Sequence, residues 1–180
     1  SGKTQQLRQY VDGKLHGTVT QWYESGGKSL QESWLHGKRE GQSKQWHENG
    51  KDKSLATYIN HKLHGLLQRW RADGSKQEQT HYANGLKEGA STLWFAGGQL
   101  QQQSSYQQNQ LHGAFKEWVA DGTLVAEGHY ANGNKDGKWQ KWYPSGNKLN
   151  IGSYASGLLQ GPFEAWYADG TKAMQHSYSN

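Results

Sequence analysis

Tyrosine, tryptophan and glycine, rather than aliphatic residues, mark regular positions along this chain. A ring recurs every 24 residues, a glycine follows it seven positions later, and a Trp follows that glycine after five more. The first column is Tyr10, Trp34, Tyr58, Tyr82, Tyr106, Tyr130, Tyr154 and Tyr178, and the last is Trp22, Trp46, Trp70, Trp94, Trp118, Trp142 and Trp166. Columns that run without a slip indicate about seven and a half copies of one 24-residue unit.

Two turn signals in each unit predict β-hairpins. Pairs such as Asn84-Gly85 and Asn132-Gly133 mark a first turn, and pairs such as Asn49-Gly50 and Asp121-Gly122 mark a second. Asn-Gly and Asp-Gly favour tight hairpin turns, where positive φ is needed. The stretches between turns have the length of strands. Helices are not expected, because the recurring glycines would break them and no apolar face has helical spacing.

The sequence therefore predicts an all-β fold, an elongated single-layer antiparallel meander of about seven and a half hairpin repeats of 24 residues. We expect residues 1–9 to form an N-terminal cap or tail and residues 10–180 to form one repeat domain. The framework rings are expected to stack along the ribbon. His61 and Asn109 stand where other repeats have the first-turn glycine, and a left-handed conformation is less usual for His61.

Composition excludes several classes of protein. The 180 residues include 9 Trp and 10 Tyr but no Cys, which excludes disulfides and thiolate metal sites. No apolar run reaches the length of a membrane-spanning helix, and no signal segment follows Ser1. The net charge of +5 is spread along the chain, so we expect no nucleic-acid partner.

Residues that differ between repeats are the candidates for binding. Side chains alternate faces along a strand, so the face opposite Trp22 carries Val19 and Tyr23. Followed through later repeats, this face becomes more aromatic. The predicted partner-binding residues are Arg69, Arg71, Phe95, Phe115, Trp139, Tyr143, Phe163 and Tyr167. Exposed, they would form a protein-binding stripe; alternatively, a curled sheet buries them as its own core.

A second pattern has a period of 48 residues. Leu-His pairs such as Leu63-His64 alternate with charged pairs such as Arg39-Glu40 and Lys135-Asp136, which we expect to be solvated turns. Histidines two repeats apart would be separated by about 19 Å at normal strand spacing, so no metal site is expected. No catalytic triad, apolar carboxylate pair or phosphate-binding loop stands out. The sequence predicts neither enzymatic activity nor a cofactor.

The Tyr-x-Asn-Gly core with the later Trp and second turn resembles the MORN repeat (membrane occupation and recognition nexus), and the 24-residue version is similar to repeats of bacterial YwqK-type antitoxins. This resemblance implies a bacterial immunity-type protein that occludes a toxin or secreted effector. We expect a periplasmic location rather than a cytoplasmic one. A membrane- or lipid-associated scaffold is the alternative. The sequence does not predict the oligomeric state.

Overall fold

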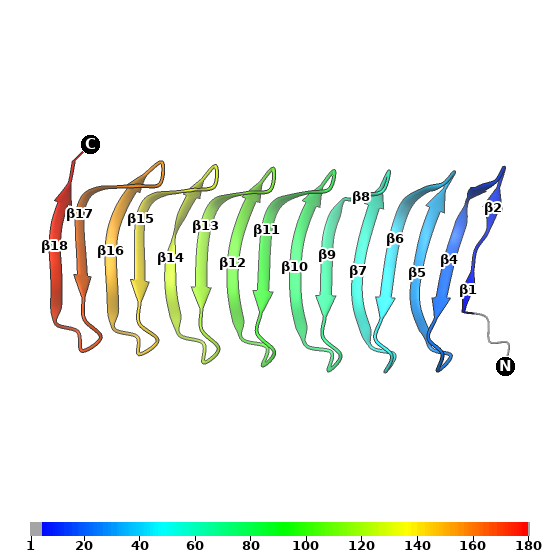
Figure 1. The fold of residues 1–180 in the computed structure, drawn as a ribbon, viewed down its shortest axis with the longest axis horizontal. Coiled ribbons are helices and arrows are strands. Elements are labelled where there is room, and N and C mark those ends of the chain that lie inside the picture. Colours follow the sequence, from blue (N-terminus) through cyan, green and yellow to red (C-terminus); the bar gives the residue numbers. More distant parts are fainter. Residues whose placement is uncertain (1–4, 180) are drawn as a thin grey trace. The chain divides into compact units, whose positions relative to one another are not determined.

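The computed structural model describes residues 5–179 and consists of antiparallel strands joined by turns. The chain divides into two compact units, Ser1–Lys87 and Glu88–Asn180, which we describe separately. Within each unit, strands adjacent in the sequence lie side by side in one layer (Figure 1). No helix capable of crossing a bilayer occurs in residues 5–179.

The first unit is a meander with a small hairpin beside it. Its strands follow the order β1 (Gln6–Leu7), β4 (Gly17–Trp22), β5 (Lys28–Leu35), β6 (Lys38–Trp46), β7 (Asp52–Ile59), β9 (Gly65–Trp70) and β10 (Lys76–Ala83). β2 (Tyr10–Val11) pairs with β3 (Lys14–Leu15), and β8 (Lys62–Leu63) pairs with β7. Of the predicted N-terminal segment, residues 1–4 lie outside the described residues, and β1 pairs with β4.

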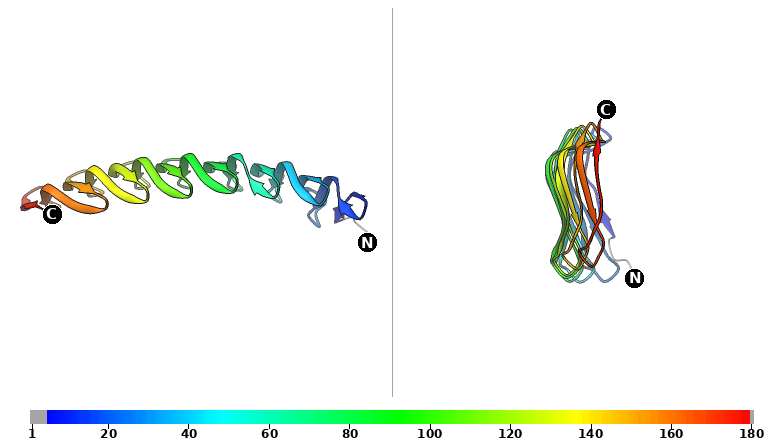
Figure 2. Two further views of the ribbon diagram at one scale, coloured as in Figure 1. Left: turned by 90° about the horizontal axis from the view of Figure 1, so that it is seen from above. Right: turned by 90° about the vertical axis from the view of Figure 1, so that its left-hand side faces the viewer.

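The second unit repeats the same arrangement. Its strands are β11 (Leu86–Trp94), which begins at the end of the first unit, β12 (Leu100–Gln107), β13 (Gln110–Trp118), β14 (Leu124–Ala131), β15 (Asn134–Trp142), β16 (Lys148–Ala155), β17 (Leu158–Trp166) and β18 (Lys172–Tyr178). The strands are bowed along their length rather than straight (Figure 2). The predicted all-β antiparallel meander of 24-residue hairpin repeats is confirmed.

The first turns have the left-handed backbone that the sequence predicted. Asn132 and Gly133 have φ of 50° and 81°, the pattern of a two-residue hairpin turn. His61, with φ of 66°, adopts this geometry without being glycine. Its Nδ1 accepts the Arg39 N–H at 3.2 Å, and its own N–H donates to the Arg39 carbonyl at 3.0 Å. These bonds to the preceding repeat hold the ring and backbone of His61 in place.

Each repeat also contains bulges. Trp142 pairs with Lys148 while Lys141 pairs with Asn150, so β16 has one extra residue beside the Trp. A second shift on the other side of β15 lies near Gly137, whose φ is 69°. Bulges increase local twist and bend the strand. The glycines that lie five residues before each Trp therefore help the strand to bend, whereas other glycines form the two turns.

The two framework columns lie on opposite faces of the sheet. Tyr130 contacts Trp139 and Phe115, with ring centroids 4.9 Å and 5.4 Å away, so these rings share one face, which we call the tyrosine face. The tryptophan face carries the Trp22-to-Trp166 column. There, Lys44 lies 5.4 Å from the Trp46 ring and Lys148 lies 5.5 Å from the Trp166 ring. The expected ring-on-ring stacking of this column is wrong in these repeats, because lysines lie against the rings.

Buried side chains gather in one central row across the tyrosine face of the first unit. The register pairs Val19 with Glu32, Glu32 with Ser43, and Ser43 with Ala56. Leu67 and Thr80 form the next pair. Each of these residues is at most 6 % exposed. Since the sheet has one layer, cross-strand contacts of this kind supply its core.

In the second unit, from β13 onward, this central row alternates large rings with glycines. Phe115 pairs with Gly128, and Trp139 with Gly152, which in turn pairs with Phe163. A Cβ added to Gly128 would lie 2.3 Å from the Trp139 indole. The indole therefore lies directly over the neighbouring strand, in space that only glycine leaves open. This packing excludes water from the ring without a second layer.

We expect Gly128→Ala to destabilise the chain by about 1–3 kcal/mol, the usual range for overpacking. The added methyl group collides with the Trp139 ring, which must leave its position over β14. Urea unfolding followed by circular dichroism measures the change. Gly27→Ala is the matched control, because nothing lies within 4 Å of its added Cβ. Equal unfolding free energies for the two variants would contradict the packing of indole over glycine.

Candidate functional site

Trp139, one of the predicted partner-binding residues, is buried. Its side chain is 2 % exposed, and its Nε1–H donates to the His129 carbonyl at 2.9 Å. The Phe115 and Tyr130 rings contact the Trp139 indole, and Lys135 Nζ lies 4.4 Å from the centre of the indole ring. The prediction of an exposed stripe is wrong at Trp139, because the glycine beside it lets the indole pack down onto the sheet. Here the alternative, burial as core, applies.

The other predicted rings occupy different environments. Phe115 and Phe163 are half-buried in the central row, and Phe163 contacts Tyr178 edge-on at 6.1 Å. Tyr143 is half-buried beyond the end of β15, where its hydroxyl donates to the Trp166 carbonyl at 3.0 Å. Phe95, also half-buried, begins the turn after β11. These rings do not form a continuous exposed stripe, and their role in binding stays a prediction.

Tyr167 is the predicted ring that remains well exposed. It follows β17, and 60 % of its surface is accessible. Its backbone N–H donates to Thr171 O at 2.8 Å and closes the second turn, leaving the phenol outside the central row. Tyr167 is thus available for contact with a partner.

Charged residues of the 48-residue pattern pack against rings instead of lying in solvent. Arg39 lies 4.6 Å from the Tyr58 ring and 5.7 Å from the Trp34 ring, and its Nε is 3.0 Å from Glu32 Oε2. Glu32 is 5 % exposed and also accepts the Trp34 Nε1–H at 2.8 Å. The expectation of a solvated turn is wrong for Arg39, because the tyrosine face holds its guanidinium between two rings.

Lys135 occupies the equivalent place in the second unit. Its Nζ lies 4.4 Å from the Trp139 ring and 5.0 Å from the Tyr154 ring. Burial lowers the pKa of Lys135, and burial raises the pKa values of Tyr130 and Tyr154. In neighbouring repeats the same position holds leucine, and Leu159 pairs with Tyr154. From one repeat to the next, this position beside the tyrosine ring thus alternates between a leucine and a cationic side chain.

Arg69 and Arg71 line a pocket of about 330 Å³ in the first unit. Arg69 and Trp70 are the last two residues of β9. The Nη1 atom of Arg69 is 2.8 Å from Glu78 Oε2. Arg71 Nη1 donates to the Lys76 carbonyl at 2.5 Å. The remaining lining residues are Gln45, His47, Lys53, Ser54, Trp70, Ala72 and Gln77. The structure brings the two predicted arginines together, on a different unit from the predicted rings.

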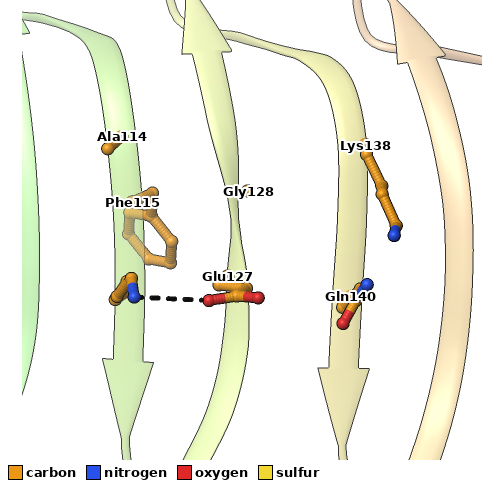
Figure 3. Close-up of a pocket in the computed structure, with 7 residues that line it drawn as sticks. Ala114, Phe115, Glu127, Gly128, Lys138 and Gln140 are labelled. Carbon is orange, nitrogen blue, oxygen red and sulfur yellow. Dashed lines mark ion pairs between the residues drawn. The ribbon is translucent and has the colours of Figure 1, made fainter.

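A shallow trough crosses the tryptophan face of the second unit. One hollow, of about 240 Å³, is lined by residues that include Ala114, Lys116, Glu127, Lys138 and Gln140 (Figure 3). Glu127, on the middle strand, is paired with Lys116 at 3.4 Å. A second hollow of about 250 Å³ shares Ala114 and Lys116 and extends to Ala90 and Gln103. Sequence reasoning missed this trough, although small residues at Ala90 and Ala114 were a visible signal for it.

The hollows on the two units offer open binding surfaces. Within residues 5–179, no three side chains among His, Asp and Glu come together in a way that would hold a metal ion. The Arg69–Arg71 pocket and the trough are open hollows on sheet faces, lined by side chains that include donors and acceptors of hydrogen bonds. Such surfaces bind a partner by contact and charge complementarity.

Because Trp139 is core and Tyr167 is not, their truncations should differ sharply. We expect Trp139→Ala to cost about 3–5 kcal/mol, as for other large core truncations. Tyr167→Ala, which removes a ring with 60 % of its surface exposed, should change the stability by at most about 0.5 kcal/mol. Chemical unfolding of both variants measures the difference. A Trp139→Ala protein as stable as the parent would return Trp139 to the list of binding residues.

The chain matches a known family of repeats at three places. The model of the MORN repeat variant matches residues 39–60, 87–108 and 135–155, which begin at the cationic residues Arg39, Lys87 and Lys135. No curated protein matches the sequence. Repeats of this family are generally modules that interact with proteins or membranes. The three matches fall in phase with the 24-residue hairpins, so these segments of the chain are similar to the MORN repeat variant.

Proposed function

We propose that this chain is a non-enzymatic protein-binding module whose partner is a bacterial toxin or secreted effector, neutralised by covering its active site. The observation that carries the proposal is the trough on the tryptophan face of the second unit, from Ala90 to Gln140, which no second layer of the described chain covers. A periplasmic location is part of the same proposal.

The trough suits a partner for two physical reasons. Hydrogen-bonded strands hold its lining side chains, so binding loses little conformational entropy. Its lining combines small side chains at Ala90 and Ala114, which admit close approach, with the exposed polar side chains of Gln103 and Lys116. Two adjoining hollows give space for protruding side chains of a protein surface that buries about 800 Å² per partner.

Site-specific photocrosslinking tests this proposal. A photoreactive residue at Gln103 or Gln140, in the trough, should crosslink to one protein in cells, whereas the same residue at Gln107, at the far end of β12, should not. The purified partner should then bind the chain with defined stoichiometry and lose its own enzymatic activity on binding.

A matched pair of substitutions separates binding from folding. Ala114→Glu places a charge in the trough and should weaken the complex by about tenfold or more. Gln107→Glu makes the same charge change on an exposed residue outside the trough and should leave affinity unchanged. Both variants should retain the parent melting temperature. Crosslinks that are equal at all three positions, or unaltered affinity of Ala114→Glu, would contradict the trough as the binding surface.

A second candidate, association with an anionic membrane surface, is favoured by the first-turn edge of the first unit. Val11, Leu35 and Ile59 are 44 %, 47 % and 39 % exposed at successive hairpin tips. Each pairs across its hairpin with a lysine: Lys14, Lys38 and Lys62. Backbone bonds from one tip to the preceding repeat, such as Gly37 N–H to the Leu15 carbonyl at 2.7 Å, hold the tips in a row. Apolar tips flanked by lysines suit an anionic bilayer interface.

Sedimentation with vesicles of equimolar phosphatidylcholine and phosphatidylserine tests this second candidate. The parent chain should sediment at low salt and be released at high salt. The double variant Leu35→Ser/Ile59→Ser should lose sedimentation, because it removes the apolar tips while leaving every lysine in place. Met174→Ser, at a residue 44 % exposed within β18 of the second unit and away from the first turns, is the control. Absence of sedimentation at low salt would eliminate this function.

A further inference from the structure

We infer that the Arg69–Arg71 pocket of the first unit binds an acidic segment of a partner protein, a short stretch carrying Asp or Glu side chains. The inference rests on the proposed function, because it names the chemistry of a protein partner. It concerns a different surface from the trough, so that its experiment fails or succeeds independently of the crosslinking experiment at the trough.

The charge of the pocket is the first argument. Lys53, Arg69 and Arg71 line it together with His47, and its lining residues include no carboxylate. Glu78, outside the lining, pairs with Arg69, whose side chain remains 51 % exposed. The Asp73 carboxylate is held in its own turn by the Ser75 N–H and hydroxyl, both at 2.7 Å. These bonds, more than the nearby Arg71 charge, lower the pKa of Asp73.

Local backbone geometry concentrates these side chains. Trp46 pairs with Asp52 while Gln45 pairs with Ser54, so Lys53 is the extra residue of a bulge in β7. Gln77 is the extra residue of the equivalent bulge in β10. Both residues line the pocket. The bulges thus add one cation and one amide to the side chains that the regular strands supply.

Comparison among the repeats shows that the positive charge is local. The position of His47 and Arg71 holds Tyr, Phe or Val in the other repeats, namely Tyr23, Phe95, Val119, Tyr143 and Tyr167. Tyr23 and Tyr143 donate their hydroxyls to the Trp carbonyl of the next repeat, and His47 Nε2 bonds the Trp70 carbonyl at 2.9 Å in the same way. The fold therefore accepts a ring here, and a requirement of the framework does not explain the cation at Arg71.

Size and surroundings favour a peptide over a free anion or a lipid headgroup. A volume of about 330 Å³ is in the range of ligand pockets and exceeds the size of a single small ion. Trp70 and the amides of Gln45 and Gln77 line it, and these groups suit peptide stems and backbone. The exposed apolar tips at Leu35 and Ile59 lie at the first turns, whereas the pocket lies by the second turns. Guanidinium groups bind carboxylates in paired hydrogen bonds.

Arginine side-chain NMR gives a direct test. The chain contains four arginines, namely Arg8, Arg39, Arg69 and Arg71. We expect the Nε–H signals of Arg69 and Arg71 to shift saturably on titration with a capped peptide of alternating Glu and Gly. The Arg39 signal, from a side chain paired with buried Glu32, should stay in place as an internal control. A matching Gln-Gly peptide should produce no shift.

Variants assign the binding to the pocket. Lys53→Gln/Arg71→Gln should weaken peptide binding by about tenfold or more, since charge-assisted hydrogen bonds are lost. Lys38→Gln/Lys62→Gln removes the same charge outside the pocket and should retain affinity within about twofold, as expected of distant charges screened by salt. The double variant Lys53→Gln/Arg71→Lys should bind the peptide more tightly than Lys53→Gln/Arg71→Gln. Melting temperatures of all variants verify that they are folded.

Three outcomes would overturn the inference. The first is the absence of a saturable shift at Arg69 and Arg71. The second is a response to inorganic phosphate without a response to the peptide, which would identify a small-anion site. The third is a response only to phosphatidylserine-containing vesicles, which would assign the pocket to lipid. If crosslinking at Gln103 still captures a protein in any of these cases, the proposed function stands and the acidic segment alone is rejected.

Discussion

A single-layer sheet has to exclude water from its side chains without a second layer to cover them. In this protein that constraint is met by contacts between neighbouring strands on the tyrosine face. The first unit uses side chains of modest size, such as Val19, Ala56 and Leu67, all at most 5 % exposed. The second unit uses rings that lie across glycines, as Trp139 does over Gly128. Apolar area is thus buried on one face of the sheet, by contacts between side chains of neighbouring strands.

The same constraint explains the alternation of leucine with cations. A residue beside each tyrosine has to cover the ring, and both a leucine and the aliphatic stem of Arg or Lys supply apolar contact. The cation adds an electrostatic attraction to the ring faces, as Arg39 does for Tyr58 and Lys135 for Tyr154. It also introduces a desolvation cost, which is visible in the lowered pKa of Lys135. At Arg39, buried Glu32 offsets this cost.

The fold was predictable because turn chemistry and period repeat in every unit, so an exception such as His61 does not alter the pattern. The environments of individual side chains were not predictable in the same way. Alternation placed Phe115 and Trp139 on one face, but exposure depended on the residue across the strand pair. The glycines at Gly128 and Gly152, where other repeats have Ala56 or Thr80, were the available signal for burial. Reading that signal required the register between strands, which the periodicity alone does not give.

Repeats separate structural requirements from other constraints, because each position is sampled several times within one chain. Where most repeats have a ring at one position, the ring reflects a requirement of the fold. A residue of another type at that position needs a separate explanation. At Arg39 the explanation is internal: Glu32 and two rings receive the cation. At Lys53 and Arg71 the cations line an open pocket without a carboxylate among its lining residues. This positive lining is complementary to the carboxylates of an acidic segment, which is the physical basis for assigning this pocket to an acidic partner.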